Sequence, residues 1–234
     1  YDQVVLRRNN GDPYAYIVGE KYFYGLPFIV NQNVLIPRPE TEQIIELALE
    51  WLDKNDLMQQ PINLLDLGTG SGILAVTLAL NVPQAQVYAV DISEKALMVA
   101  KENAFRHAVN HRINWYLGNY FEPFKQITPS PTFTIIVGNP PYISKPDLES
   151  LPDTVSLYEP LSALDGGKDG LASYRQIINE LVPFINAPGL LLLEAGAMQQ
   201  DSISELVNKQ SVFNELKWHY DLAGLPRILA ASMS

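Results

Sequence analysis

The sequence predicts an α/β fold, a doubly wound, mostly parallel seven-stranded sheet with helices on both faces and an antiparallel hairpin at one edge. Between residues 63 and 209, short and almost wholly apolar segments alternate with longer segments whose apolar residues recur every three or four positions. Strands that are apolar on both faces are typical of a parallel sheet buried between helices. The last two apolar segments, 216–220 and 228–231, are close enough in the chain to form the antiparallel hairpin.

The residues before the sheet predict a short helix and a small hairpin. Residues 1–8 suit the end of a helix with Val4 and Val5 turned inward. Residues 9–13 are turn formers, and we expect extended chain after them. Two strands around a turn are expected at 22–24 and 28–30, packed onto the rest of the protein by Phe23, Tyr24 and Phe28.

Each later element follows from its apolar spacing and from the residues at its ends. Apolar positions spaced by three and four predict a helix over 39–53, which begins at Pro39 and carries Glu40 and Glu42 in its first turn, as the helix dipole favours. Ser93 is the expected N-cap of a later helix. Strands are expected at 64–67, 87–90, 113–117, 134–137 and 189–194, and further helices at 73–80, 94–108, 174–184 and 199–209.

The composition excludes several classes of protein. The chain has 234 residues, no Cys, and 16 Lys+Arg against 26 Asp+Glu, which gives a net charge of −10. Without Cys there are no disulfides, no thiol catalysis and no Cys-containing metal sites, which fits a cytoplasmic protein. The acidic balance argues against direct binding of nucleic acid through many phosphates. No apolar run approaches the roughly 20 residues of a membrane helix, so no membrane partner is expected.

A glycine-rich turn follows the first strand of the predicted sheet. Asp66 is followed by Gly68, Gly70 and Gly72 in the pattern D-x-G-x-G-x-G. Open α/β sheets bind ligands at the carboxyl ends of their strands, so this turn is a candidate ligand site. The dinucleotide pattern G-x-G-x-x-G fails because Ile73 occupies its last position, and no Gly-Lys-Ser/Thr of a phosphate loop follows. The structural alternative is a turn that only packs the helix closely against the strand.

The pattern matches the signature of S-adenosylmethionine-dependent methyltransferases, whose acidic residue and bare backbone receive the amino acid end of the donor. Asp91 ends the next strand, 23 residues beyond Gly68, where a carboxylate can accept hydrogen bonds from both ribose hydroxyls. The predicted fold is therefore a class I methyltransferase fold, and the predicted cofactor is S-adenosyl-L-methionine, with S-adenosyl-L-homocysteine as its product. The cofactor-binding candidates in these turns are Asp66, Gly68, Thr69, Gly70, Ser71, Gly72 and Asp91.

A second polar turn, Asn139-Pro140-Pro141-Tyr142, follows the strand expected at 134–137 and lies at the same sheet edge. An amide or aromatic amine nitrogen is a poor nucleophile, because its lone pair is delocalised, so its N–H bonds must be held by acceptors. The Asn139 side-chain oxygen and the Pro140 carbonyl can supply them. The prolines stiffen the loop, and Tyr142 can lie against a planar group. Asn139, Pro140 and Tyr142 are therefore catalytic candidates, Pro141 joins them in substrate binding, and Asn139 also borders the donor; a plain proline-rich turn is the alternative.

With their flanks, the two turns make the chain resemble the glutamine methyltransferases of peptide chain release factors, the HemK/PrmC family. The N-P-P-Y turn is shared with DNA adenine and rRNA methyltransferases, whereas the stretch from Ile36 to Glu42 is much more particular. The resemblance implies methyl transfer to the glutamine amide in the Gly-Gly-Gln tip of a release factor, and it implies that Tyr120 flanks the donor's adenine. Further matching positions are 11–13, 23–25, 89–91, 158–160, 166–171 and 221–224.

The resemblance also implies three parts and leaves three alternatives. Residues 1–10 are expected to be the remnant of an N-terminal helical domain that is otherwise missing, 11–38 a linker with a β-hairpin, and 39–234 the methyltransferase domain of a monomer. The alternatives are a glutamine methyltransferase of a ribosomal protein, a nucleic acid amino-methyltransferase acting on an adenine or guanine amine, and a donor-binding module without activity.

Three charged residues have two interpretations each, and the histidines do not suggest a metal. Arg38 and Glu40 either contact donor or substrate or form a salt bridge that pins the helix to the hairpin. Glu159 either lines the substrate entrance or anchors its loop. No metal is expected, because His107 and His111 lack a third ligand despite their spacing of four.

Overall fold

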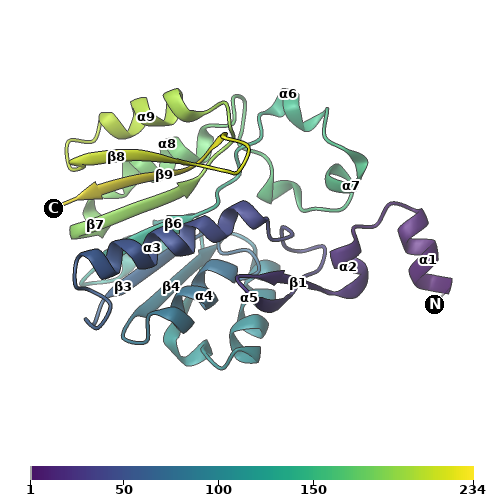
Figure 1. Cartoon of the computed structure of the whole chain (residues 1–234), viewed down its shortest axis with the longest axis horizontal. Helices are drawn as coiled ribbons and strands as arrows, with labels where there is room; N and C mark the ends of the chain where they lie inside the picture. The colour runs from purple at the N-terminus through teal and green to yellow at the C-terminus, as the bar shows by residue number, and fades with distance from the viewer. Residues whose placement is uncertain (1) are drawn as a thin grey trace.

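The computed structural model describes residues 2–234 and shows a seven-stranded sheet between two layers of helices (Figure 1). The strand order is β5-β4-β3-β6-β7-β9-β8, in which β3 to β7 run parallel and β9 is antiparallel to both of its neighbours. This confirms the predicted fold class. The strands are β3 (Asn63–Leu67), β4 (Gln86–Asp91), β5 (Ile113–Leu117), β6 (Phe133–Gly138), β7 (Ile185–Glu194), β8 (Glu215–Tyr220) and β9 (Pro226–Met233).

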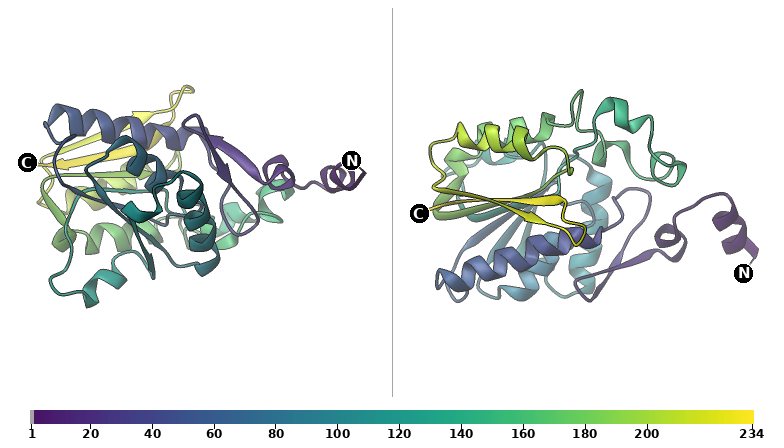
Figure 2. Two further views of the ribbon diagram at one scale, coloured as in Figure 1. Left: turned by 90° about the horizontal axis from the view of Figure 1, so that it is seen from below. Right: turned by 45° about the horizontal axis from the view of Figure 1, so that its top comes forward.

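Helices cover the two faces of the sheet separately (Figures 1 and 2). One face carries α3 (Glu42–Lys54), α4 (Ile73–Asn81) and α5 (Glu94–Arg106), and the other carries α8 (Ala172–Glu180) and α9 (Gln200–Asn208). Because successive side chains of a strand point to opposite faces, Leu64 of β3 enters the first core and Leu65 the second. Each buried leucine contributes roughly 1.5–3 kcal/mol, which explains why the central strands are rich in apolar residues.

The N-terminal region differs from its prediction. Helix α1 (Asp2–Asn9) is present, but the side chains of Val4 and Val5 are 51% and 41% exposed, so their predicted inward orientation is wrong. A second helix, α2 (Tyr14–Val18), occupies chain predicted to be extended. It forms because Tyr16 is buried and its hydroxyl donates to the carbonyl of Val34 at 2.5 Å, a long-range contact that local sequence does not reveal. Residue 1, part of the predicted helical remnant, lies outside the described residues.

The predicted hairpin is present as β1 (Glu20–Phe23) and β2 (Leu26–Ile29), paired antiparallel. Phe23 and Phe28 are buried in the core beneath α3 to α5, with their ring centroids 6.2 Å apart, and Tyr24 is half-buried against the same cluster. The side chain of Asn103 on α5 closes the contact, since it accepts from the amide of Ile29 at 2.7 Å and donates to its carbonyl at 2.9 Å. The hairpin is thereby attached to the sheet domain, as predicted.

Two irregular segments complete the carboxyl edge of the sheet. The linker leaves β2, passes along this edge and enters α3 through a 3₁₀ turn, Pro39–Thr41. The loop after β6 contains the short helices α6 (Lys145–Leu148) and α7 (Asp153–Ser156), which were not predicted, and a 3₁₀ turn at Leu161–Ala163. Across residues 2–234, no helix combines the length and apolar character needed to cross a membrane.

Candidate active site

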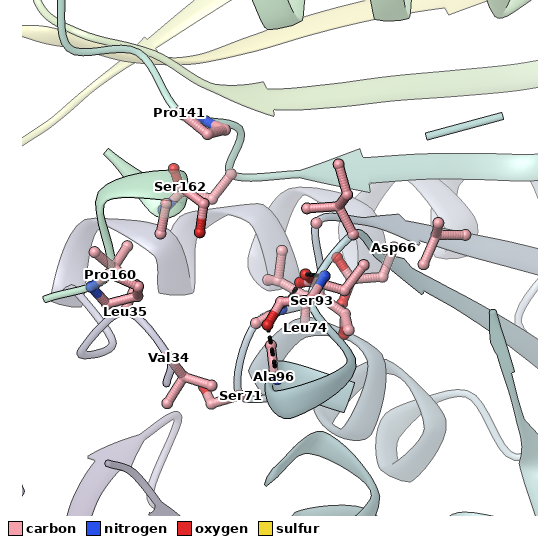
Figure 3. A pocket seen from close by; sticks show the side chains of 18 of the residues that line it. Val34, Leu35, Asp66, Ser71, Leu74, Ser93, Ala96, Pro141, Pro160 and Ser162 are labelled. Carbon is pink, nitrogen blue, oxygen red and sulfur yellow. Dashed lines mark hydrogen bonds between the residues drawn. The ribbon is translucent and has the colours of Figure 1, made fainter. Parts of the chain in front are cut away.

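A cleft opens at the carboxyl edge of the sheet, between the strands and the linker (Figure 3). The space between its walls, with the solvent-filled open mouth included, is about 950 Å³. Figure 3 shows Pro160 and Ser162 across the cavity from Ser93 and Asp66. The predicted site residues that line the cleft are Asp66, Gly68, Thr69, Gly70, Ser71, Asp91, Tyr120, Asn139 and Pro141. Two distant turns therefore meet at one cavity.

Asp66 lines this cleft and has one buried carboxylate oxygen without a hydrogen-bond partner within residues 2–234. Its Oδ2 accepts from the hydroxyl of Thr69 at 2.6 Å and from the amide of Ala75 at 3.1 Å. Its Oδ1 is buried and has no hydrogen-bond partner among the described residues. Burial raises the pKa of Asp66 to about 7, although the bonds from Thr69 and Ala75 lower it. A bound N–H group, above all a cationic one, would satisfy this oxygen.

Asp91 ends β4 and ties the glycine turn to it. Its Oδ2 accepts from the amide of Gly70 and its Oδ1 from the amide of Ser93, both at 2.8 Å. Burial raises the pKa of Asp91, and the bonds from Ser93 and Gly70 oppose that shift. A carboxylate has about four acceptor positions, so Asp91 keeps the capacity to accept from two further donors in the cleft.

Gly72 and Tyr120 both have a positive φ, but only Tyr120 lines the cleft. Gly72 does not line the cleft: it begins α4 with φ +82°, and a Cβ there would lie 3.1 Å from the Cα of Ala100, so it packs α4 against α5. Tyr120 lines the cleft with φ 48°, a conformation that costs a non-glycine residue energy and is concentrated at functional sites. Burial also raises the pKa of its hydroxyl.

Asn139 follows β6, which pairs with β3, so the two turns are neighbours. Its Nδ2 donates to the Oγ1 of Thr41 at 3.3 Å, and that hydroxyl donates to the Oε2 of Glu194 at 2.5 Å. Thr41 and Glu194 are both buried, with Glu194 2% exposed. Sequence reasoning did not assign either residue a role in the site. The signals that could have found them are that Thr41 lies in the distinctive 36–42 stretch and that Glu194 ends a strand at the ligand-binding edge.

The rest of the Asn-Pro-Pro-Tyr turn lies beside the cleft. Pro140 is buried, and neither it nor Tyr142 lines the cavity. The carbonyl of Tyr142 accepts from the Nε2 of Gln199 at 3.0 Å, which holds the turn against the segment before α9. Burial and the charge of Glu194 raise the pKa of Tyr142 to about 12, so its phenol stays neutral.

An ion pair joins the linker to the loop after β6. The Nη2 of Arg38 lies 2.6 Å from the Oε1 of Glu159, while the Oε2 of Glu159 accepts from the amide of Ile36 at 3.2 Å. The salt bridge considered for Arg38 therefore exists, with Glu159 as the partner and not Glu40. Glu159 anchors its loop to the linker, and this anchor shapes the cleft wall, because Arg38 and Pro160 both line it.

Comparison with curated proteins gives matches along almost the whole chain. The release factor glutamine methyltransferase of Nitratidesulfovibrio vulgaris is 40% identical over 232 residues, which are 99% of this chain and 76% of that protein. Those of Thermodesulfovibrio yellowstonii and Bacillus subtilis are 37% and 38% identical, covering 99% and 97% of this chain and 80% and 77% of their own lengths. At this identity and coverage the matches reach from the linker to the last strand.

A family model and solved structures match less specifically. Residues 41–140 match the model described as ribosomal protein L11 methyltransferase, which is less than half of the chain. A methyltransferase from Pyrococcus furiosus superposes with a TM-score of 0.63 at 18% identity, covering 100% of this chain and 98% of that one. The N-terminal domain of human METTL16, solved with SAH, gives 0.63 at 14% identity over 90% and 77%. These likenesses show the class I methyltransferase fold.

Proposed function

The chain belongs to the family of release factor glutamine methyltransferases, which are protein-glutamine N-methyltransferases, and from this we propose how its cleft serves the reaction. The donor would be S-adenosylmethionine, held between the glycine turn and the linker. The acceptor would be the side-chain amide of the glutamine in a release factor's Gly-Gly-Gln tip, held at the Asn-Pro-Pro-Tyr turn. The observation that carries the proposal is the meeting of these two turns at one cavity.

The cleft residues suit the chemical groups of the donor. The unpartnered Oδ1 of Asp66 suits the donor's ammonium group, and the spare acceptor capacity of Asp91 suits the two ribose hydroxyls. Tyr120 and the apolar Ile92 offer surfaces for the adenine. When bound, the donor would supply an electrophilic methyl group on its sulfonium. Gly68, Thr69, Gly70 and Ser71 would bring backbone close to it, whereas Gly72 would act by packing.

The acceptor residues supply orientation. The Oδ1 of Asn139 and the carbonyl of Pro140 would accept the two N–H bonds of the glutamine amide, which turns the nitrogen lone pair toward the methyl group. Pro141 stiffens this turn, and Tyr142, neutral and held by Gln199, would flank the planar amide. The nitrogen would take the methyl group as the bond between the donor's sulfur and the methyl breaks, leaving that electron pair on the sulfur of S-adenosyl-L-homocysteine. The nitrogen would then release one proton to solvent, so this chain need not supply a strong base.

The experiment that tests the function is mass spectrometry of the Gly-Gly-Gln peptide from a release factor after incubation with the protein and S-adenosylmethionine. One added methyl group on the glutamine is expected, and none on a release factor whose glutamine is replaced by alanine. The ribosomal-protein alternative, which the match to the L11 methyltransferase model keeps open, is tested with ribosomal protein as acceptor. Label on ribosomal protein or nucleic acid alone would overturn the proposal.

The Asn139→Ala variant tests the role of the second turn. It removes one acceptor for the glutamine N–H bonds, so turnover should fall by about 100-fold, as when one oriented hydrogen-bonding group of an active site is lost. Donor affinity should stay near that of the wild type, because Asp66 and Asp91 are unchanged. Unchanged turnover would refute the assignment, and absent turnover in the wild type would favour a donor-binding module.

We also propose the division into residues 1–10, 11–38 and 39–234, supported by the turn formers at 9–13 and by the position of the hairpin before α3. Limited proteolysis with cleavage near residue 10 would support it. The protein would act as a monomer in the cytoplasm, the compartment in which release factors work. Sedimentation and fractionation test these two statements.

A further inference from the structure

We propose that Glu194, acting through the hydroxyl of Thr41, is a positioning residue that turns the Asn139 amide so that its oxygen faces the substrate. The inference rests on the proposed function, because it explains how that function's acceptor turn is oriented. It adds two buried residues that the motif itself does not contain.

Three separate elements bring the side chains of Thr41, Asn139 and Glu194 together. Thr41 belongs to the 3₁₀ turn before α3, Asn139 follows β6, and Glu194 ends β7. The Nδ2 of Asn139 lies 3.3 Å from the Oγ1 of Thr41, which lies 2.5 Å from the Oε2 of Glu194. Since Thr41 and Glu194 are buried, water does not compete freely for these bonds.

The number of available protons decides which group donates and which accepts in the hydrogen bonds that link Asn139, Thr41 and Glu194. An ionised carboxylate only accepts hydrogen bonds, and a threonine hydroxyl has a single proton to donate. When Thr41 gives that proton to Glu194, only its lone pairs remain for Asn139. Asn139 must then present its NH₂ group to Thr41, and its Oδ1 is turned away. In the opposite orientation, the Oδ1 of Asn139 would face the Oγ1 of Thr41 with no proton between them. Its NH₂ group would then face the N–H bonds of the substrate amide.

Protonation of Glu194 would remove this constraint. A neutral carboxyl can donate to Thr41, whose hydroxyl can then donate to the Oδ1 of Asn139 and stabilise the reversed amide. Burial raises the pKa of Glu194 to about 7, although the hydrogen bond from Thr41 lowers it. The Asn139 amide should therefore reverse its orientation close to neutral pH.

Other charged and titratable groups face Glu194 from the elements packed around it. Glu40 in the 3₁₀ turn raises its pKa, and Arg227 at the start of β9 lowers it. The hydroxyl of Tyr174 on α8 donates to the carbonyl of Glu194 at 2.6 Å, and Tyr142 lies close enough for the charge of Glu194 to raise its own pKa. Both phenols have raised pKa values and stay neutral near pH 7, so Glu194 is the group of this cluster that titrates there.

Nuclear magnetic resonance tests the inference without any substrate. In ¹⁵N-labelled protein, the side-chain amide signals of Asn139 should shift with pH with a midpoint near that of Glu194. The shift should be absent in Glu194→Gln, because a glutamine amide does not titrate. It should be lost in Thr41→Val, which keeps the shape without the hydroxyl, and kept in Thr41→Ser. A pH-independent signal in the wild type, or equal behaviour of the two Thr41 variants, would overturn the inference.

Kinetics with a release factor supply the second measurement. Thr41→Val should lower kcat by about 10- to 100-fold, because no hydroxyl then holds the Asn139 amide with its oxygen toward the substrate. Thr41→Ser should restore most of the kcat. The wild-type kcat should rise with pH through the titration of Glu194, and that rise should be missing in Glu194→Gln.

The two measurements separate the two proposals. If the wild type does not methylate the Gly-Gly-Gln peptide, the proposed function fails, and the Asn139 signals still decide whether Glu194 orients the amide. If the wild type is active and Thr41→Val keeps its full kcat and its pH dependence, the function stands and the role of Glu194 is refuted. Circular dichroism confirms that the compared variants are folded.

Discussion

Replacing Asp66 with Asn is expected to stabilise the protein at alkaline pH while weakening its binding of the donor. Asp66 is 1% exposed, and burial raises its pKa from 3.8 to about 7. A carboxylate buried this deeply costs stability whenever it is ionised. Asn keeps the shape of the side chain and does not titrate, so the variant removes this cost together with the acceptor that the donor's ammonium group would use.

The sign and size follow from proton linkage. In the unfolded chain Asp66 ionises with its usual pKa of 3.8, and in the folded protein with a pKa of about 7. Between these values the folded state binds more protons, so stability falls as pH rises and levels off above about pH 7. A difference of about three pKa units corresponds to roughly 4 kcal/mol. Roughly 2–3 kcal/mol of this loss in unfolding free energy should occur between about pH 5 and pH 8.

Urea unfolding of wild type and Asp66→Asn at several pH values measures the effect as a difference between the two proteins. The difference cancels the contributions of other groups, including Glu194, and any constant cost of the new NH₂ group. Asp53→Asn is the matched control, because Asp53 is exposed on α3. A pH-independent difference for Asp66→Asn would refute the raised pKa, and equal donor affinity by calorimetry would refute the role of Oδ1.

Three further substitutions test the cleft and its walls. Gly72→Ala should cost roughly 1–3 kcal/mol in urea unfolding, because of its φ of +82° and the 3.1 Å approach to Ala100; no cost would contradict that close packing. Asp91→Ala should weaken donor binding by about 5- to 100-fold, measured by calorimetry, and intact affinity would argue against a ribose contact. Glu159→Gln should cost about 1–3 kcal/mol of unfolding free energy, because Arg38 loses its carboxylate partner; a variant as stable as wild type would show that the pair does not anchor the linker.

The sheet could be predicted because burial of its strands leaves a pattern in the local sequence. Strands such as β3 and β6 are buried on both faces, so most of their side chains are apolar and the run itself marks the strand. Helix α2 is different, because its five residues are too few to be stable alone. It depends on the contact from Tyr16 to Val34 across the linker, and no local pattern contains that contact. For the same reason the exposure of Val4 depends on what lies next to α1 in space.

The site was predictable where spacing and sheet topology suffice. Asp66, Asp91 and Asn139 each follow a strand, and parallel strands bring their carboxyl ends to one edge. The contact between Thr41 and Glu194 joins residues 153 positions apart and requires the linker to cross that edge. A distinctive stretch in the sequence therefore pointed to the right segment, and only the fold shows what Thr41 touches there.

The strand order also bears on when the protein becomes active during its synthesis. Strand β9 is the last described strand in the chain, yet it lies between β7 and β8, where Glu194 pairs with Ile228 and the amide of Ala195 donates to the carbonyl of Arg227 at 2.8 Å. While the chain is still on the ribosome, β7 is an open edge of the parallel sheet, prone to pair with other strands. Translation of β9 closes that edge, so a nascent chain stalled before residue 226 lacks the strand that pairs with Glu194 beside the acceptor turn.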